Sequence, residues 1–189
     1  MALADPEYEM TPLRKAAEAA EAATGLRAEI IRGVLTMSPR RTGKCAGIVN
    51  NLYDQLRSAL PERLSPFPVA SVPMPGDPDD YATPDLLVCD TGFADSDDWL
   101  ADPGDVELVV EVVSKGNSTK DTRDMVGWYA DAGIPVYLLI DPRDGSWTLY
   151  TLPRDGEFQA RRHGLYGEDV ELPDLGVKIT TEGLARYDR

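Results

Sequence analysis

Residues 106–113 read Val-Glu-Leu-Val-Val-Glu-Val-Val, the most strand-like stretch of the sequence. Most of its apolar residues are β-branched, which favours a β-strand. Because side chains alternate along a strand, Val109, Glu111 and Val113 are predicted to share one face. An isolated ionised carboxylate is strongly disfavoured in an apolar interior, so Glu111 must face a polar group or an ion. Glu111 is therefore the first candidate functional residue.

A second carboxylate lies in a similar setting upstream. Residues 81–90 (YATPDLLVCD) predict a strand with Pro84 at an edge or bulge and Asp85 directly after it. If the two strands are neighbours, Asp85 and Glu111 meet on one face, where a divalent cation would turn an electrostatic cost into a binding site. The alternative is structural: Asp85 caps a bend, and Glu111 pairs with an arginine or lysine of a covering helix. An arginine that neutralised both carboxylates and left no room for an ion would leave only a scaffold.

The remaining patterns predict a mixed α+β fold, with helices and strands interleaved along one domain over residues 1–189. An N-terminal helical arm (1–25) would precede a core at 26–182 that contains a β-hairpin and a central mixed sheet flanked by helices. The predicted helices are 12–24, 45–60 and 120–132. The predicted strands are a hairpin at 26–37 turning at Arg32-Gly33, then 67–72, 81–90, 106–113, 136–140, 147–152 and 158–163. The apolar stripe of the second helix is Cys45, Val49, Leu52, Leu56 and Leu60.

Composition narrows the function classes. The 189 residues include 33 acidic and 19 basic side chains, for a formal net charge of -14. Such a field repels polyanions at long range, which argues against a protein that coats nucleic acid through many phosphate contacts. It does not argue against a local site that holds a divalent cation, because Mg²⁺ takes carboxylate ligands.

The cysteines and the apolar segments indicate a cytoplasmic protein. Cys45 and Cys89 form no CxxC pair, and with the single His163 they are too few for a structural zinc site. We expect both to be free, buried thiols of a reducing compartment. The first residues lack the basic and apolar regions of a secretory signal, and the apolar run at 136–140 is too short to span a bilayer, so no membrane partner is expected.

The order of elements from residue 44 onward resembles the PD-(D/E)XK, or restriction-endonuclease-like, nuclease superfamily. Several local patterns resemble one bacterial branch of it, the Uma-type restriction endonucleases, over about residues 28–180. The matching residues are Glu29 to Gly33 with Met37-Ser38-Pro39, Pro84-Asp85, Glu111-Val112-Val113-Ser114, Asp121, Tyr129, Ala132-Gly133-Ile134-Pro135-Val136-Tyr137 and Ile140-Asp141-Pro142.

The resemblance implies a metal-dependent endonuclease that hydrolyses DNA phosphodiester bonds. Asp85 and Glu111 would coordinate Mg²⁺ or Mn²⁺, and the backbone carbonyl of Val113 would add a ligand. The ion would lower the pKa of a bound water and offset charge on the phosphate. Glu29 recurs near the site in this branch and is a further candidate, with a solvent-facing strand residue as its alternative. A homodimer is expected, since two-fold assemblies are the commonest and suit cutting both strands.

The superfamily's lysine is missing from its usual places. It normally lies two residues after the glutamate, where this chain has Val113, or four residues before the tyrosine, where it has Met125. Lys120, at the start of the predicted third helix, is the candidate replacement. Two hypotheses follow: a metal-dependent endonuclease with a degenerate site, or a catalytically inactive nuclease fold that serves as a binding or interaction module.

Overall fold

A six-stranded mixed sheet forms the centre of the structure, a computed structural model that describes residues 11–38, 41–115 and 119–188. For residues 119–123 it describes the backbone only. The strand order is β10-β9-β8-β7-β6-β3, in which β7 and β8 are parallel and the other neighbouring pairs are antiparallel. The strands are β3 (Leu64–Phe67), β6 (Leu86–Asp90), β7 (Leu108–Val112), β8 (Val136–Asp141), β9 (Ser146–Arg154) and β10 (Glu157–Leu165).

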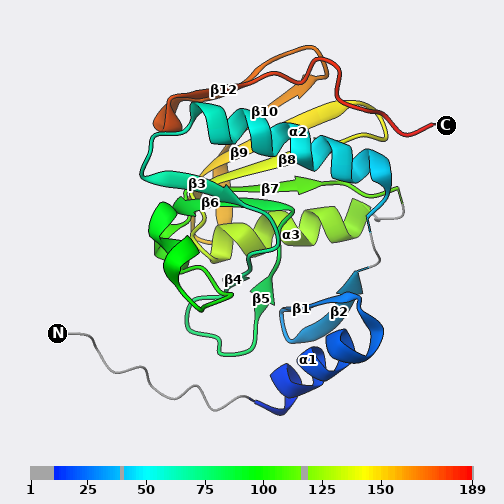
Figure 1. The fold of residues 1–189 in the computed structure, drawn as a ribbon, viewed down its shortest axis with the longest axis vertical. Helices are drawn as coiled ribbons and strands as arrows, with labels where there is room; N and C mark the ends of the chain where they lie inside the picture. The colour runs from blue at the N-terminus through cyan, green and yellow to red at the C-terminus, as the bar shows by residue number, and fades with distance from the viewer. Residues whose placement is uncertain (1–10, 39–40, 116–118, 189) are drawn as a thin grey trace.

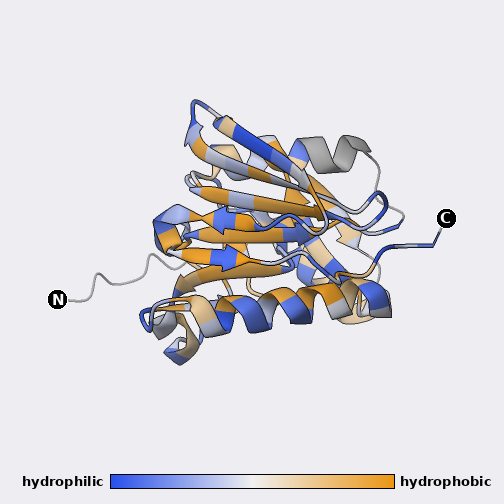
Figure 2. Ribbon diagram, turned by 90° about the horizontal axis from the view of Figure 1, so that it is seen from above, coloured by the Kyte–Doolittle hydropathy of each residue, from blue (hydrophilic) through white to orange (hydrophobic). Residues whose placement is uncertain are grey.

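Two helices cover opposite faces of this sheet (Figure 1). Helix α2 (Gly43–Ala59) packs on one face, and helix α3 (Thr119–Asp131), the crossover between β7 and β8, packs on the other. The apolar colouring of the sheet continues onto the side of α2 that faces it (Figure 2). Alternation along β7 thus sends successive side chains into two separate cores. Val109 and Val113 share one face, as predicted, and this face is covered by α3.

The apolar stripe of α2 differs slightly from the prediction. Its buried residues are Cys45, Ile48, Leu52 and Leu56, whereas Val49 and Leu60 are only partly buried. A spacing of three residues rather than four after Cys45 keeps the stripe on one face of a 3.6-residue helix. The helix begins at Gly43, two residues before the predicted start, and the Thr42 side chain caps it by accepting the Cys45 N–H.

A smaller sheet, in the order β2-β1-β5-β4, lies below the main one in Figure 1. Helix α1 (Pro12–Thr24) packs against it and spans the predicted residues, with Thr11 as its N-cap and Gly25 as its C-cap. The predicted hairpin turn is also confirmed, with Arg32 and Gly33 both at positive φ. The strands are β1 (Arg27–Ile31), β2 (Val34–Ser38), β4 (Val72–Pro73) and β5 (Tyr81–Ala82).

Short elements complete the described part of the chain. A two-stranded sheet of β11 (Val170–Leu172) and β12 (Val177–Ile179) contributes apolar residues to the core under α2. The short 3-10 helices are η1 (Thr91–Asp95), η2 (Pro103–Asp105) and η3 (Pro173–Leu175). None of the helices in the described ranges is long and apolar enough to cross a bilayer.

Two predicted strands are placed differently. The predicted strand at 67–72 is wrong: β3 ends at Phe67, and after an isolated bridge between Ser71 and Leu100 the next strand is β4. Pro68 has no N–H to donate, and Val69 has a φ of 69°, which an extended strand excludes. The predicted strand at 81–90 divides into β5 and β6, and residues 83–85 between them join the two sheets. The mixed α+β fold class itself is confirmed.

Candidate active site

Asp85 and Glu111 lie opposite each other on neighbouring antiparallel strands. The register pairs Leu86 of β6 with Val110 of β7, and continuing it by one residue sets Asp85 opposite Glu111. The Oδ2 atom of Asp85 accepts the backbone N–H of Val112 at 2.8 Å, which fixes this carboxylate against β7. Asp85 is 7% exposed. The meeting of the two carboxylates on one face, predicted from strand alternation, is therefore present.

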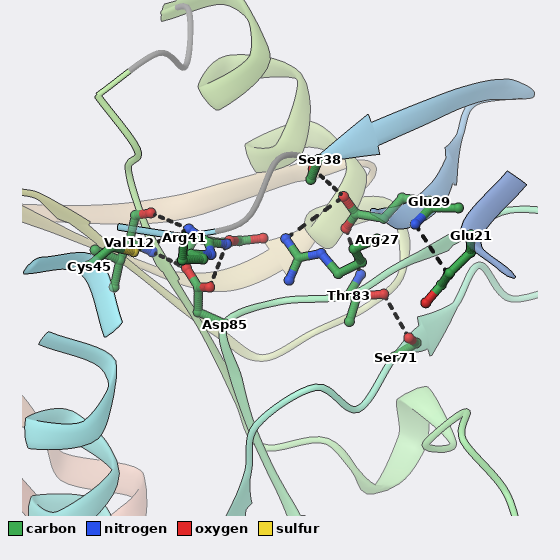
Figure 3. Close-up of polar contacts among 12 residues, drawn as sticks. Glu21, Arg27, Glu29, Ser38, Arg41, Cys45, Ser71, Thr83, Asp85 and Val112 are labelled. Carbon is green, nitrogen blue, oxygen red and sulfur yellow. Dashed lines mark hydrogen bonds and ion pairs between the residues drawn. The ribbon is translucent and has the colours of Figure 1, made fainter. Parts of the chain in front are cut away.

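An arginine lies between these carboxylates. Arg41, in the loop that leads into α2, places Nη2 against Oδ1 of Asp85 and 3.6 Å from Oε2 of Glu111. Its Nη1 donates a 2.8 Å hydrogen bond to the carbonyl oxygen of Val112 and a 3.5 Å one to Sγ of Cys45. Figure 3 shows the Arg41 side chain enclosed by Asp85, Val112 and Cys45. A guanidinium thus occupies the position where the sequence predicted an ion.

Burial dominates the electrostatics of both carboxyl groups. Burial raises the pKa of Asp85 above its ordinary value, while Arg41 and the Val112 N–H act in the opposite direction. Burial, reinforced by the charge of Asp85, raises the pKa of Glu111 to about 8. Two carboxyl groups so close cannot both ionise without a cation, so the site requires one in order to hold two negative charges.

The second oxygen of Glu111 is held from the α3 side. The hydroxyl of Tyr129, which is fully buried on α3, donates a 2.9 Å hydrogen bond to Oε1 of Glu111. Burial raises the pKa of Tyr129 well above its ordinary value, so this hydroxyl stays a donor at physiological pH. Tyr129 therefore orients Glu111 and leaves Oε2 toward Arg41.

Glu29 lies beside this group on β1 and is buried rather than solvent-facing. Its Oε1 accepts the N–H of Thr83 at 2.8 Å, and its Oε2 accepts from the Ser38 hydroxyl at 3.3 Å. Nη2 of Arg27 lies 4.0 Å from Oε2 (Figure 3). The hairpin thus brings a third carboxylate and a second guanidinium to the end of the main sheet.

The oxygen atoms around Arg41 are suited to a hard divalent cation. In the described part of the chain, no three His, Cys, Asp or Glu side chains group closely enough to hold a metal ion by themselves. Mg²⁺, however, uses one or two carboxylates and completes its shell with water and substrate phosphate. Asp85, Glu111 and the Val112 carbonyl offer such a partial oxygen set, and all three already contact one cationic group. The residues present therefore fit a Mg²⁺ or Mn²⁺ ion in exchange for the guanidinium.

The predicted carbonyl ligand differs by one residue from the carbonyl that faces Arg41. The Val113 carbonyl accepts a 3.0 Å hydrogen bond from the Tyr187 hydroxyl, whereas the Val112 carbonyl faces Arg41. The side chain of Lys120 lies outside the described residues. Lys115 donates to the Asp188 carbonyl oxygen, and Met125 is half-buried against the core under α3.

A cavity of about 310 Å³ opens beside Asp85. Its lining combines the guanidinium-bearing Arg27 and Arg41 and the amide of Asn50 with apolar walls. Val69, which is 76% exposed, contributes to the lining at a φ of 69°. This combination of cations and apolar surface beside two carboxylates is suited to an organic anion. The remaining lining residues are Gly25, Ser38, Ala46, Val49, Pro68 and Pro84.

The sequence did not predict the roles of two residues that complete this site, Arg41 and the hydroxyl of Tyr129. Arg41 lies just before helix α2, in a stretch of sequence without a periodic pattern to constrain side-chain direction. Its partners are 44 and 70 positions away in the sequence. Tyr129, quoted above only as part of the family resemblance, packs helix α3 on the sheet, and its hydroxyl adds the bond to Glu111. The one available signal was an arginine pair in a strongly acidic chain, just before the first core helix.

Comparison with known proteins agrees with this fold. Residues 14–182 match a sequence model of the Uma2 family, described as "Putative restriction endonuclease". No curated protein sequence matches the chain. A crystal structure from Anabaena variabilis, described as "a putative nuclease belonging to DUF820", aligns with a TM-score of 0.65 and 18% identity, over 81% of this chain and 85% of that one. At this identity, the second likeness concerns the fold alone.

Proposed function

The chain belongs to the Uma2 family of restriction-endonuclease-like proteins, and from that premise we propose that it is a Mg²⁺- or Mn²⁺-dependent endonuclease acting on DNA. The observation that carries the proposal is the convergence of Asp85 and Glu111 at the end of the central sheet, where both contact the guanidinium of Arg41. Structural ion pairs also place carboxylates in strands. The arginine shared by the two carboxylates fits that structural alternative, and the open cavity beside Asp85 is the observation that favours a functional site.

Each residue of the site has a role in the proposed reaction. A divalent ion bound by Asp85, Glu111 and the Val112 carbonyl would supply charge neutralisation at the phosphate and a more acidic water. Asp85 is oriented for this by the Val112 N–H, and Glu111 by the Tyr129 hydroxyl. Arg27, which lines the cavity, would bind a phosphate oxygen. Glu29 and Lys120 stay candidates for handling the proton of the attacking water.

Nicking of supercoiled plasmid tests the proposal. Wild-type protein with Mg²⁺ or Mn²⁺ is expected to nick DNA, and EDTA to stop it. Asp85→Asn and Glu111→Gln should each lower the rate by about 100-fold or more, because each removes a charge that the transition state needs. Glu107→Gln is the matched control. Glu107 directly precedes β7, is partly exposed, and among the ion pairs of the described residues pairs only with Arg63. Equal rates in all four proteins would exclude this site.

A second function is favoured by Arg41 itself. An arginine that already contacts both carboxyl groups, together with the absence of lysine at Val113 and Met125, suits a nuclease fold retained as a binding or interaction module. Calorimetric titration with Mn²⁺ separates the two. Binding that is lost in Glu111→Gln supports the enzyme, whereas no binding up to millimolar Mn²⁺ supports the module.

A further inference from the structure

The contacts of Arg41 match those expected of a bound ion. Its guanidinium touches Asp85 and Glu111 and donates to the Val112 carbonyl, so it uses the three oxygens that the proposed ion would need. The side chain is 24% exposed, and it also lines the cavity beside Asp85. The Arg41 guanidinium therefore lies among the oxygens that would bind the ion, and the cavity beside Asp85 is open next to it.

We propose that Arg41 and the divalent ion exchange at this site: without the ion, the guanidinium holds its place, and when the ion binds, the guanidinium moves into the adjoining cavity and binds substrate phosphate there. This inference rests on the proposed function, since it assumes that an ion binds to Asp85 and Glu111. It assigns to Arg41 the cationic role for which the sequence has no lysine at Val113 or Met125.

Mutual exclusion follows from the geometry. Nη2 of Arg41 is in contact with Oδ1 of Asp85 and 3.6 Å from Oε2 of Glu111, so an ion bound to both oxygens would overlap the guanidinium. A competing state lowers apparent affinity in proportion to its population. The two charged contacts and the bond to Val112 strongly favour the state in which Arg41 occupies the site. Competition with Arg41 should therefore lower the affinity for Mn²⁺ about tenfold or more.

The cavity offers the displaced guanidinium a suitable new position. Arg27 already lines it, so a phosphate there would meet two guanidinium groups and could accept forked hydrogen bonds from each. The chain as a whole has a net charge of -14, so two arginines beside one cavity make this part of the surface more favourable for an anion than the average. Ion binding would thereby prepare the site for its anionic substrate.

Calorimetric titration with Mn²⁺, without DNA, tests the exchange. Arg41→Gln is expected to bind Mn²⁺ about tenfold more tightly than wild type, and Mn²⁺ should raise its melting temperature by more. Arg41→Lys keeps a positive charge but loses the planar guanidinium, so its Mn²⁺ affinity should lie between those of wild type and Arg41→Gln. It provides the test if Arg41→Gln does not fold. Arg63→Gln, which removes an exposed arginine paired with Glu107, is the matched control and should behave as wild type.

Equal or weaker binding in Arg41→Gln, with wild type binding Mn²⁺, overturns the exchange and leaves the proposed endonuclease in place. Failure of wild type and both Arg41 variants to bind Mn²⁺ overturns the ion site, and the exchange with it. Fluorescence anisotropy of a labelled duplex, read before cleavage, tests the second step. Mn²⁺ should strengthen duplex binding more in wild type than in Arg41→Gln, and an equal gain in both overturns the phosphate-binding role.

Discussion

The hydroxyl of Tyr129 donates a 2.9 Å hydrogen bond to Oε1 of Glu111, and so links helix α3 to the carboxylate on β7. The crossover helix therefore fixes one oxygen of Glu111 while the other faces Arg41. A residue that packs the helix onto the sheet also orients a candidate ligand, so stability and site geometry are coupled at this point.

Tyr129→Phe tests that coupling. Removing the hydroxyl leaves Oε1 of buried Glu111 without this donor, so the free energy of unfolding should fall by about 1–3 kcal/mol. Urea denaturation measures the change, and Mn²⁺ affinity by calorimetry should fall with it. Tyr53→Phe, on helix α2 at the opposite face of the sheet from Tyr129, is the control and should change neither quantity much. A Tyr129→Phe variant as stable as wild type would show that the bond contributes nothing.

The raised pKa of Glu111 predicts a pH-dependent stability. The folded protein holds a proton on this group up to about pH 8, whereas the unfolded chain releases it near 4.5. Between these values the folded state binds more protons, so the free energy of unfolding falls as pH rises from about 4.5 to about 8.

Metal-free urea denaturation across that range measures this effect as the difference between wild type and Glu111→Gln. The contribution of Glu111 is fully present below pH 4.5 and is lost as pH rises through 8. A difference that is flat, or that grows with pH, would contradict the raised pKa.

Asp80 anchors the turn of the hairpin that carries Glu29. Its carboxylate accepts the N–H of Arg32 at 2.5 Å and of Gly33 at 2.7 Å, and the residue is 3% exposed. Asp80→Ala leaves two backbone donors without this acceptor and should destabilise the protein by about 2–4 kcal/mol, as measured by chemical denaturation. Asp80→Asn keeps one acceptor oxygen and should cost less. Equal losses in the two variants would mean that the hydrogen bonds are not the cause.

Two glycines give opposite expectations for the same change. A Cβ on Gly164 would come within 2.4 Å of the Trp147 ring, so Gly164→Ala should destabilise by about 1–3 kcal/mol. Gly47, exposed on α2, has open space around it, so Gly47→Ala should stabilise by about 0.5–1 kcal/mol. Thermal unfolding of both variants checks the pair. A stabilised Gly164→Ala would contradict the close packing on Trp147.

Elements with a repeating pattern were predictable from the sequence. The apolar run of β7, the hairpin at Arg32-Gly33 and the caps of α1 are local signals, and they lie where expected. The meeting of Asp85 and Glu111 was also predictable, because alternation fixes faces once two strands are known to be neighbours.

Long-range contacts from loops were not predictable in the same way. The contact of Arg41 with Asp85 joins residues 44 positions apart, and no local pattern constrains the loop that carries it. The strand expected at 67–72 failed for a related reason, since the left-handed backbone at Val69 runs against the preference of a β-branched residue. The catalytic role of Glu29 and Lys120 and the homodimer stay predictions.

The bond from the Thr83 N–H to Glu29 ties the small sheet to the segment that leads into Asp85. The hairpin supplies Glu29 and Arg27 without contributing a strand to the large sheet. Evolution or protein engineering could therefore exchange this hairpin for another, altering the charge and shape around the candidate site while the large sheet is preserved. Chimaeras built by such grafting would show whether ligand selectivity can change while the stability of the fold stays the same.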